Sequence, residues 1–139
     1  MSRRVLDASL ALSWLLPDER SAALHSVREQ FFTGGGVWVA AHWRLEVCNA
    51  LWMAERRKRL DAPGVTRAVT LVTQLPVLVD DETNSRAGAD TLALARRHAI
   101  SVYDAAYLEL ALRLNLPLAT TDPALTRAAN SAAVPIFTP

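Results

Sequence analysis

Residues 4–17, RVLDASLALSWLLP, contain the unit that decides the fold. A short apolar run at 4–6 is followed at once by Asp7, and a helical stretch occupies residues 9–16. The run is brief, rich in Val and Leu, and does not alternate cleanly between apolar and polar residues. Such runs are typical of strands buried on both faces of a parallel sheet. We therefore expect strand–helix units of this kind along the chain.

Apolar runs and helical stretches alternate through the rest of the sequence. The other predicted strands lie at 37–40, 77–79, 116–120 and 134–137, and the other predicted helices at 18–32, 41–59, 63–74, 83–98 and 101–114. This alternation predicts an α/β fold with right-handed crossovers. We expect one domain over residues 1–139, with a central parallel sheet of about five short strands flanked by helices.

The composition narrows the class of protein. The 139 residues are 51% hydrophobic and 21% charged, which is typical of a globular domain with its own core. The net charge of +1 does not by itself indicate a nucleic-acid binder. The one cysteine, Cys48, excludes an internal disulfide and suits a reducing cytoplasm. We find no signal peptide, and the apolar segment at 8–17 is too short to span a membrane, so we expect a cytoplasmic protein.

Four carboxylates are predicted to meet at one edge of the sheet. Asp7 and Asp122 directly follow predicted strands, so both lie at the edge where parallel strands end. Glu46 lies early in the helix that leaves the second strand, and Asp104 lies in the first turn of the helix that leads to the fourth. Both fall on helix faces that otherwise carry apolar residues, so we expect them to point inward. In open α/β sheets this edge holds the usual ligand crevice.

A simpler interpretation of Asp104 is a first-turn acid that interacts with the positive end of the helix dipole. A solvated carboxylate belongs on the other face of the same helix, where we expect Glu109 to lie.

The chemistry of converging carboxylates favours a metal site. Such groups repel one another, and burial adds a desolvation cost, unless a cation compensates their charge. An all-oxygen cluster without His or Cys at ligand spacing suits Mg²⁺ or Mn²⁺ rather than zinc. One or two such ions activate water and stabilise the leaving oxygen during attack on a phosphodiester. Candidate supporting residues, each also explained by capping, turn bonding or an exposed helix position, are Ser9, Asn49, Thr120 and Thr121.

Four segments in this order resemble PIN-domain ribonucleases, in particular the VapC-type toxins of bacterial toxin–antitoxin pairs. They are VLDASLALSWLLPDE (5–19), EVCNAL (46–51), ISVYDAAYLELA (100–111) and PLATTDPAL (117–125), and together they cover nearly the whole chain. One departure is visible at AAHWRLE (40–46), which lacks the proline that opens this helix in many members. That difference affects how the helix begins and leaves the carboxylate in place.

The resemblance implies a catalytic and metal-binding site at Asp7, Glu46, Asp104 and Asp122. It further implies cleavage of RNA with Mg²⁺ or Mn²⁺, a homodimer, and inhibition by a cognate VapB-type antitoxin.

Other functions fit the sequence less well. A receiver domain also carries acids at this edge and binds Mg²⁺, but it needs a lysine late in the chain, and the only lysine is Lys58. A phosphatase with a nucleophilic aspartate usually has Asp-x-Asp after its first strand, whereas Asp7 is followed by Ala8 and Ser9. The glycines at 34–36 lack the Gly-Lys-Ser/Thr end of a phosphate-binding loop. A degenerate PIN fold that only binds partners is the non-enzymatic alternative.

Two further sets of residues indicate partners. The predicted phosphate contacts to RNA, equally explained as solvated helix ends, are Arg56, Arg57, Lys58, Arg59, Arg96 and Arg97. The tryptophans, which we divide between the core and a groove for an antitoxin helix or a dimer face, are Trp14, Trp38, Trp43 and Trp52.

Overall fold

A computed structural model describes residues 3–16, 31–33 and 35–137, so most of the predicted helix at 18–32 lies outside the described residues. Its four strands are β1 (Arg4–Leu6), β2 (Val37–Val39), β3 (Val77–Val79) and β4 (Leu118–Ala119). All neighbouring strands pair in parallel, in the order β3-β2-β1-β4. The predicted parallel α/β architecture is therefore confirmed.

The sheet has four strands rather than about five. The predicted strand at 134–137 makes a single parallel bridge, between Leu118 and Ile136. Pro135 accepts a hydrogen bond from the Leu118 N–H but has no N–H of its own to extend the ladder. The segment therefore lies beside β4 without forming a strand.

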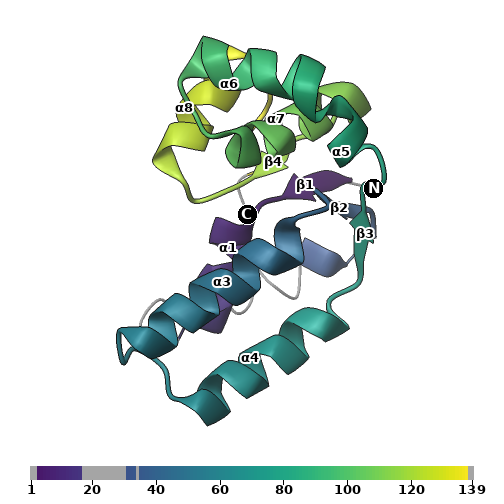
Figure 1. The fold of residues 1–139 in the computed structure, drawn as a ribbon. Helices are drawn as coiled ribbons and strands as arrows, with labels where there is room; N and C mark the ends of the chain where they lie inside the picture. Colours follow the sequence, from purple (N-terminus) through teal and green to yellow (C-terminus); the bar gives the residue numbers. More distant parts are fainter. Residues whose placement is uncertain (1–2, 17–30, 34, 138–139) are drawn as a thin grey trace.

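Helices cover both faces of the sheet (Figure 1). Their bounds are α1 (Ala8–Leu15), α3 (Trp43–Arg56), α4 (Ala62–Gln74), α5 (Thr83–Arg86), η1 (Ala87–Thr91), α6 (Leu92–His98), α7 (Val102–Leu114) and α8 (Pro123–Ser131). In Figure 1, α1, α3 and α4 lie below the sheet, and α6, α7 and α8 lie above it. Within the described residues, no helix is both long and apolar enough to cross a membrane.

Two helical predictions need correction. The helix predicted at 83–98 is divided, because η1 is a π-helical segment between α5 and α6. Helix α8 was missed, although its start carries a clear signal. Asp122 caps α8 and Pro123 follows in its first turn, just as Asp61 caps α4 before Pro63.

The core consists of the inner helix faces packed on the central strands. Trp43 and Tyr107 are its largest fully buried aromatic residues, with Val5 and Leu6 of β1 beside them. Trp14 is also buried, whereas Trp52 is half exposed. The edge strand β3 departs from the expected burial on both faces, because Leu78 and Val79 are exposed.

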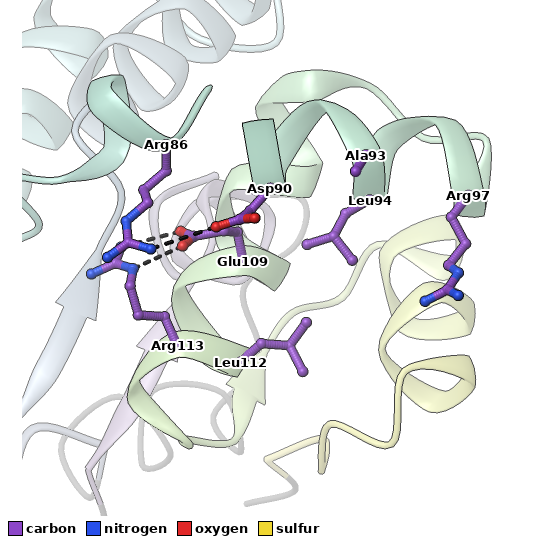
Figure 2. A pocket seen from close by; sticks show the side chains of 8 residues that line it. All are labelled: Arg86, Asp90, Ala93, Leu94, Arg97, Glu109, Leu112 and Arg113. Atoms are coloured by element: carbon purple, nitrogen blue, oxygen red, sulfur yellow. Dashed lines mark hydrogen bonds and ion pairs between the residues drawn. The ribbon is translucent and has the colours of Figure 1, made fainter. Parts of the chain in front are cut away.

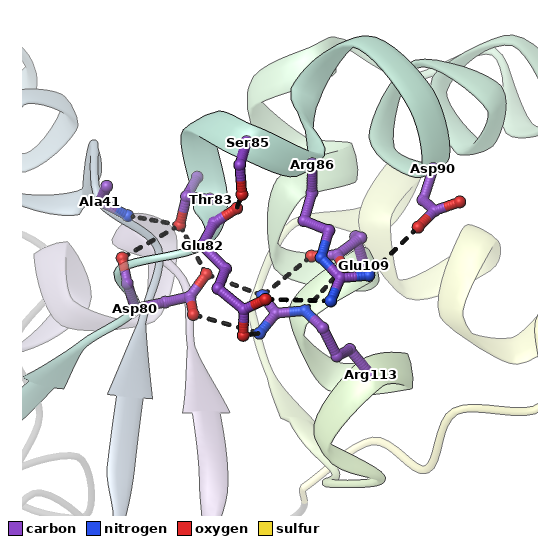
Figure 3. Close-up of polar contacts among 9 residues, drawn as sticks. All are labelled: Ala41, Asp80, Glu82, Thr83, Ser85, Arg86, Asp90, Glu109 and Arg113. Atoms are coloured by element: carbon purple, nitrogen blue, oxygen red, sulfur yellow. Dashed lines mark hydrogen bonds and ion pairs between the residues drawn. The ribbon is translucent and has the colours of Figure 1, made fainter.

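Glu109 corrects a further expectation. Rather than lying on a solvated face, it is 4% exposed and forms an ion pair with Arg113 one turn later, at 2.8 Å. The same guanidinium contacts Asp80 at 2.7 Å, and Asp80 is 3% exposed. Figure 3 shows Arg113 between these carboxylates, with Glu82 also within reach at 3.2 Å. Arg113 thus links the end of β3 to α7.

The balance of charge around Arg113 is visible in the pKa of Asp80. Burial raises this pKa, but hydrogen bonds from Arg113 and Thr83 more than offset the effect and hold it below its ordinary value. The Thr83 hydroxyl donates to Asp80 at 2.8 Å and accepts from the backbone N–H of Ala41 at 3.0 Å (Figure 3). These bonds hold the segment after β3 against the segment after β2.

We predict that Arg113→Leu lowers the free energy of unfolding by about 3–5 kcal/mol, because it leaves Asp80 and Glu109 buried without their cation. The matched control is Arg86→Leu, since Arg86 pairs only with the exposed Glu82 and Asp90 among the described acids. Chemical denaturation at neutral pH measures both. Equal losses for the two variants would contradict the role of the buried network.

Candidate active site

The strand order creates a switch point between β1 and β4. From β1 the chain proceeds outward to β2 and β3, then returns across the sheet through α5–α7 to β4 on the other side of β1. Ligand crevices of open α/β sheets form at the carboxyl ends of strands at such a reversal. Asp7 follows β1 directly, and its N–H donates to the Ala119 carbonyl of β4 at 3.2 Å.

Asp7 is the most buried of the four predicted acids, at 3% exposure. It caps α1 by accepting a hydrogen bond from the Leu10 N–H at 3.1 Å. The Ser9 hydroxyl lies 2.8 Å from both carboxylate oxygens, and the Thr120 hydroxyl donates to Oδ2. Burial raises the pKa of Asp7 to about 6, and these hydrogen bonds only partly oppose the effect.

Glu46 is brought to the site by the packing of α3 against α1. The indole of Trp43, fully buried, donates to the backbone carbonyl of Asp7 at 3.1 Å. Glu46 lies one turn further along α3, and its side chain is 31% exposed. The Tyr107 hydroxyl donates to Glu46 Oε1 at 2.5 Å, and His42 Nε2 lies 3.0 Å from the same oxygen.

Asp104 and Asp122 approach from α7 and α8. Ser101 caps α7 by accepting from the Asp104 N–H at 3.0 Å, so the Asp104 carboxylate does not serve as the cap. Burial raises the pKa of Asp104, and the charges of Asp122 and Glu46 raise it further. Asp122 caps α8 through its Oδ2, which accepts from the Leu125 N–H at 2.8 Å.

All four predicted acids line one cavity of about 310 Å³. Its other lining residues are Ala8, Ser9, Leu12, Asn49, Ala50 and Tyr107. Among the described residues that line it there is no lysine or arginine, although His42 lies 3.0 Å from Glu46. Burial is the main cause of the raised pKa values of Asp7 and Asp104, and repulsion from neighbouring carboxylates adds to both.

A divalent cation fits this arrangement. The lining offers carboxylate, hydroxyl and amide oxygens, which are the ligands of Mg²⁺ and Mn²⁺. The four carboxylates do not form a tight cage, because the only described group of three acids with ligand atoms within 4.8 Å of one another is Asp80, Asp81 and Glu82. An open set suits Mg²⁺, which keeps several of its waters. At the tighter group, Arg113 already contacts Asp80 and Glu82.

The predicted supporting residues occupy different positions. Thr120 links two acids, because its hydroxyl donates to Asp7 and accepts from the Asp122 N–H at 3.0 Å. Ser9 contacts Asp7 and accepts from the Thr121 N–H at 3.0 Å. The side chain of Asn49 lies on the exposed face of α3 and lines the acidic cavity.

The predicted basic residues divide into two groups. Arg57 and Arg59 line a cavity of about 440 Å³ that adjoins the acidic cavity and shares Ser9 and Asn49 with it. Arg97 instead lines a separate pocket of about 690 Å³ between α6 and α7, shown in Figure 2. Of the six predicted basic residues, only Arg57 and Arg59 line the cavity beside the acids.

Three neighbours of the acids were missed in the sequence. Tyr107 follows Asp104 by one turn of α7, and His42 precedes Glu46 by one turn, so helical spacing was an available signal for both. The contact of Trp43 with Asp7 joins residues 36 positions apart, and no local pattern reveals it.

Comparison with known proteins identifies the family. The family model of the PIN domain matches residues 4–131. Ribonuclease VapC3 from Pyrobaculum aerophilum is 30% identical over 118 residues, which are 85% of this chain and 88% of that protein.

Solved structures share the fold. The crystal structure of PAE2754 from Pyrobaculum aerophilum has a TM-score of 0.68 at 22% identity, covering 91% of this chain and 86% of that one. VapC20 from Mycobacterium tuberculosis, a Sarcin-Ricin loop cleaving toxin, has a TM-score of 0.64 at 14% identity, covering 98% and 99% of the two chains. With the family match over nearly its whole length and a relative at 30% identity, this chain belongs to the PIN domain family.

Proposed function

We propose that this protein is a divalent-metal-dependent endoribonuclease and the toxin of a toxin–antitoxin pair. The observation that carries the proposal is the cavity at the β1–β4 switch point, which four carboxylates line and which no described lysine or arginine lines. The resemblance to Ribonuclease VapC3, at 30% identity, supports the same activity.

Each acid has a role in the proposed reaction. Asp7, Glu46, Asp104 and Asp122 hold Mg²⁺ or Mn²⁺, which when bound supplies an activated water and stabilises the leaving oxygen of a phosphodiester. Ser9 and Thr120 orient the carboxylate of Asp7 through the hydrogen bonds described above. Asn49 and Thr121 are placed to contact the substrate, because Asn49 lines both adjoining cavities and Thr121 lines the larger of the two.

RNA is proposed to approach over the adjoining basic cavity. Arg57 and Arg59 lie there, and the exposed Arg56 and Lys58 extend the same positive segment. Such residues neutralise phosphates and set affinity rather than sequence preference. The contacts that we predict for Arg96 and Arg97 require RNA to reach the end of α6 as well.

We also propose a homodimer and a VapB-type antitoxin as partners. Leu45 is 75% exposed and Trp52 is 51% exposed, and both project from the outer surface of α3. Exposed apolar residues of this size are typical of interaction surfaces. A binding module without nuclease activity is the alternative, and the following measurement separates the two.

We predict that purified, antitoxin-free protein cleaves RNA with Mg²⁺ or Mn²⁺, and that Asp104→Asn abolishes the cleavage because an amide binds these ions poorly. The loss should exceed the roughly 10–100-fold typical of changes to residues that only support a metal ligand. Cleavage of total RNA, followed on gels, measures it.

The control for this experiment is Asp81→Asn, an exposed acid in the group that Arg113 neutralises. We expect it to cleave like the wild type. Loss of cleavage in Asp81→Asn alone would place the metal at that group, and no cleavage by the wild type with either ion would favour the binding module.

A second prediction concerns the stability of the metal-free protein. Because the folded-state pKa of Asp7 is raised to about 6, the folded protein holds this proton more tightly than the unfolded chain. The stability contributed by protonated Asp7 is full below about pH 4 and is lost as the pH rises through about 6. Asp7→Asn retains the cap of α1 and removes the charge.

In EDTA at pH 7, Asp7→Asn should therefore be more stable than the wild type by on the order of 1 kcal/mol, and near pH 4 the difference should vanish. Added Mg²⁺ should raise the melting temperature of the wild type more than that of the variant. Thermal unfolding at the two pH values measures both effects. A variant that is less stable at pH 7 and responds equally to Mg²⁺ would show that Asp7 is only a helix cap.

A third prediction addresses RNA binding. In the cleavage-deficient Asp104→Asn variant, the additional change Arg57→Ala should weaken RNA binding. It should also reduce the slope of log affinity against log salt by about one phosphate contact. Arg96→Ala in the same background tests the end of α6. Filter binding over a series of salt concentrations measures both, and an unchanged slope for Arg57→Ala would exclude the proposed path.

A further inference from the structure

One carboxylate of the site is held by side chains that serve neither as acids nor as helix caps. The Tyr107 hydroxyl donates to Glu46 Oε1 at 2.5 Å, and His42 Nε2 lies 3.0 Å from the same atom. The Tyr107 hydroxyl thus binds one oxygen of Glu46 directly, and the His42 ring nitrogen lies beside the same atom. Among the described residues, none donates a hydrogen bond to the second oxygen, Oε2.

The His42 ring joins two helices. Its Nε2 is hydrogen-bonded to the Tyr103 carbonyl at 3.1 Å, so this nitrogen carries the hydrogen, and it also lies 3.0 Å from Glu46 Oε1. The ring also packs against Tyr107 and Tyr103, with centroids 5.1 and 5.6 Å apart. His42 thus connects the start of α3, which carries Glu46, to the residue before Asp104.

Tyr107 is anchored much more firmly than Glu46 itself. It is 1% exposed, in the middle of α7, whereas the Glu46 side chain is 31% exposed. A glutamate has three rotatable side-chain bonds, and fixing them at a partly exposed position costs conformational entropy. A donor on a buried, rigid ring fixes the carboxylate before any ligand arrives.

We infer that Tyr107 and His42 are positioning residues for Glu46: the Tyr107 hydroxyl binds Oε1, the His42 ring lies beside the same oxygen, and Oε2 is left available to a divalent cation. The inference rests on the proposed function, because it assumes that Glu46 is a metal ligand. Partners of this kind orient metal ligands, and their loss typically weakens metal binding by about 10–100-fold. Neither residue contacts the reacting atoms in this account.

The test is Mn²⁺ binding, measured from the electron paramagnetic resonance signal of free Mn²⁺ as metal-free protein is titrated. Tyr107→Phe removes only the hydroxyl, and we expect it to weaken Mn²⁺ binding by about tenfold or more. The matched control is Tyr103→Phe, which removes an exposed hydroxyl one turn earlier and keeps the carbonyl that His42 contacts. It should bind Mn²⁺ like the wild type.

Two additional variants make the result decisive. Glu46→Gln should lose more affinity than Tyr107→Phe, because it alters the ligand itself. His42→Phe keeps a ring in place, removes the nitrogen that lies beside Oε1, and should also weaken Mn²⁺ binding; it serves as the test if Tyr107→Phe does not fold. Chemical denaturation of each metal-free variant separates stability from affinity, since a purely structural Tyr107 would lower the denaturation midpoint without changing the Mn²⁺ affinity of the folded protein.

The outcomes distinguish the two levels of the proposal. Wild-type affinity in Tyr107→Phe and His42→Phe, together with weakened binding in Glu46→Gln, would overturn the positioning role and leave the proposed metal site intact. Absence of Mn²⁺ binding by the wild type, or wild-type affinity in Glu46→Gln, would overturn both.

Discussion

The burial of several carboxylates beside one another at the β1–β4 switch point is the constraint on which the site depends. Asp7 is buried with its carboxylate surrounded by hydroxyl and N–H donors, yet its pKa is still raised. Asp104 is affected by two further carboxylates, and their charges raise its pKa in addition to burial. A fold that keeps such groups together loses stability unless something else supplies positive charge. This cost supports the proposal that the cavity holds a ligand.

The network around Arg113 shows how this protein treats acids that belong to the fold. Asp80 and Glu109 are as buried as Asp7, but each contacts the guanidinium of Arg113 directly. The pKa of Asp80 is lowered where that of Asp7 is raised, although burial acts in the same direction on both. The difference lies in the neighbouring cation. The acids around Arg113 are thus neutralised within the fold, whereas no described lysine or arginine lines the cavity of Asp7 and Asp104. This contrast supports a functional role for the acids of the cavity.

Much of the fold was predictable, because its signals are local. The bounds of α4 and α7 agree closely with the predicted helices, since each begins at a capping residue, Asp61 and Ser101. The missed α8 carried a signal similar to that of α4, a capping aspartate with a proline in the first turn, so that error was avoidable. The fifth strand failed for a different reason. Its apolar composition was suitable, but pairing depends on the backbone of a neighbour, and Pro135 limits the ladder to one bridge.

The sequence by itself determined the order of the elements and the position of Asp7 and Asp122 after their strands, because strand ends and helix caps depend on neighbouring residues. Tertiary structure alone decided the long-range partners of the acids. Glu109 looked like a surface residue, but the packing of α7 buried it together with Arg113, one turn along the same helix, which also contacts Asp80. Glu46 lies beside His42, one turn earlier, but receives its hydrogen bond from Tyr107, 61 residues away. The periodicity of a helix shows which face is buried, but the atoms that meet that face come from distant parts of the chain.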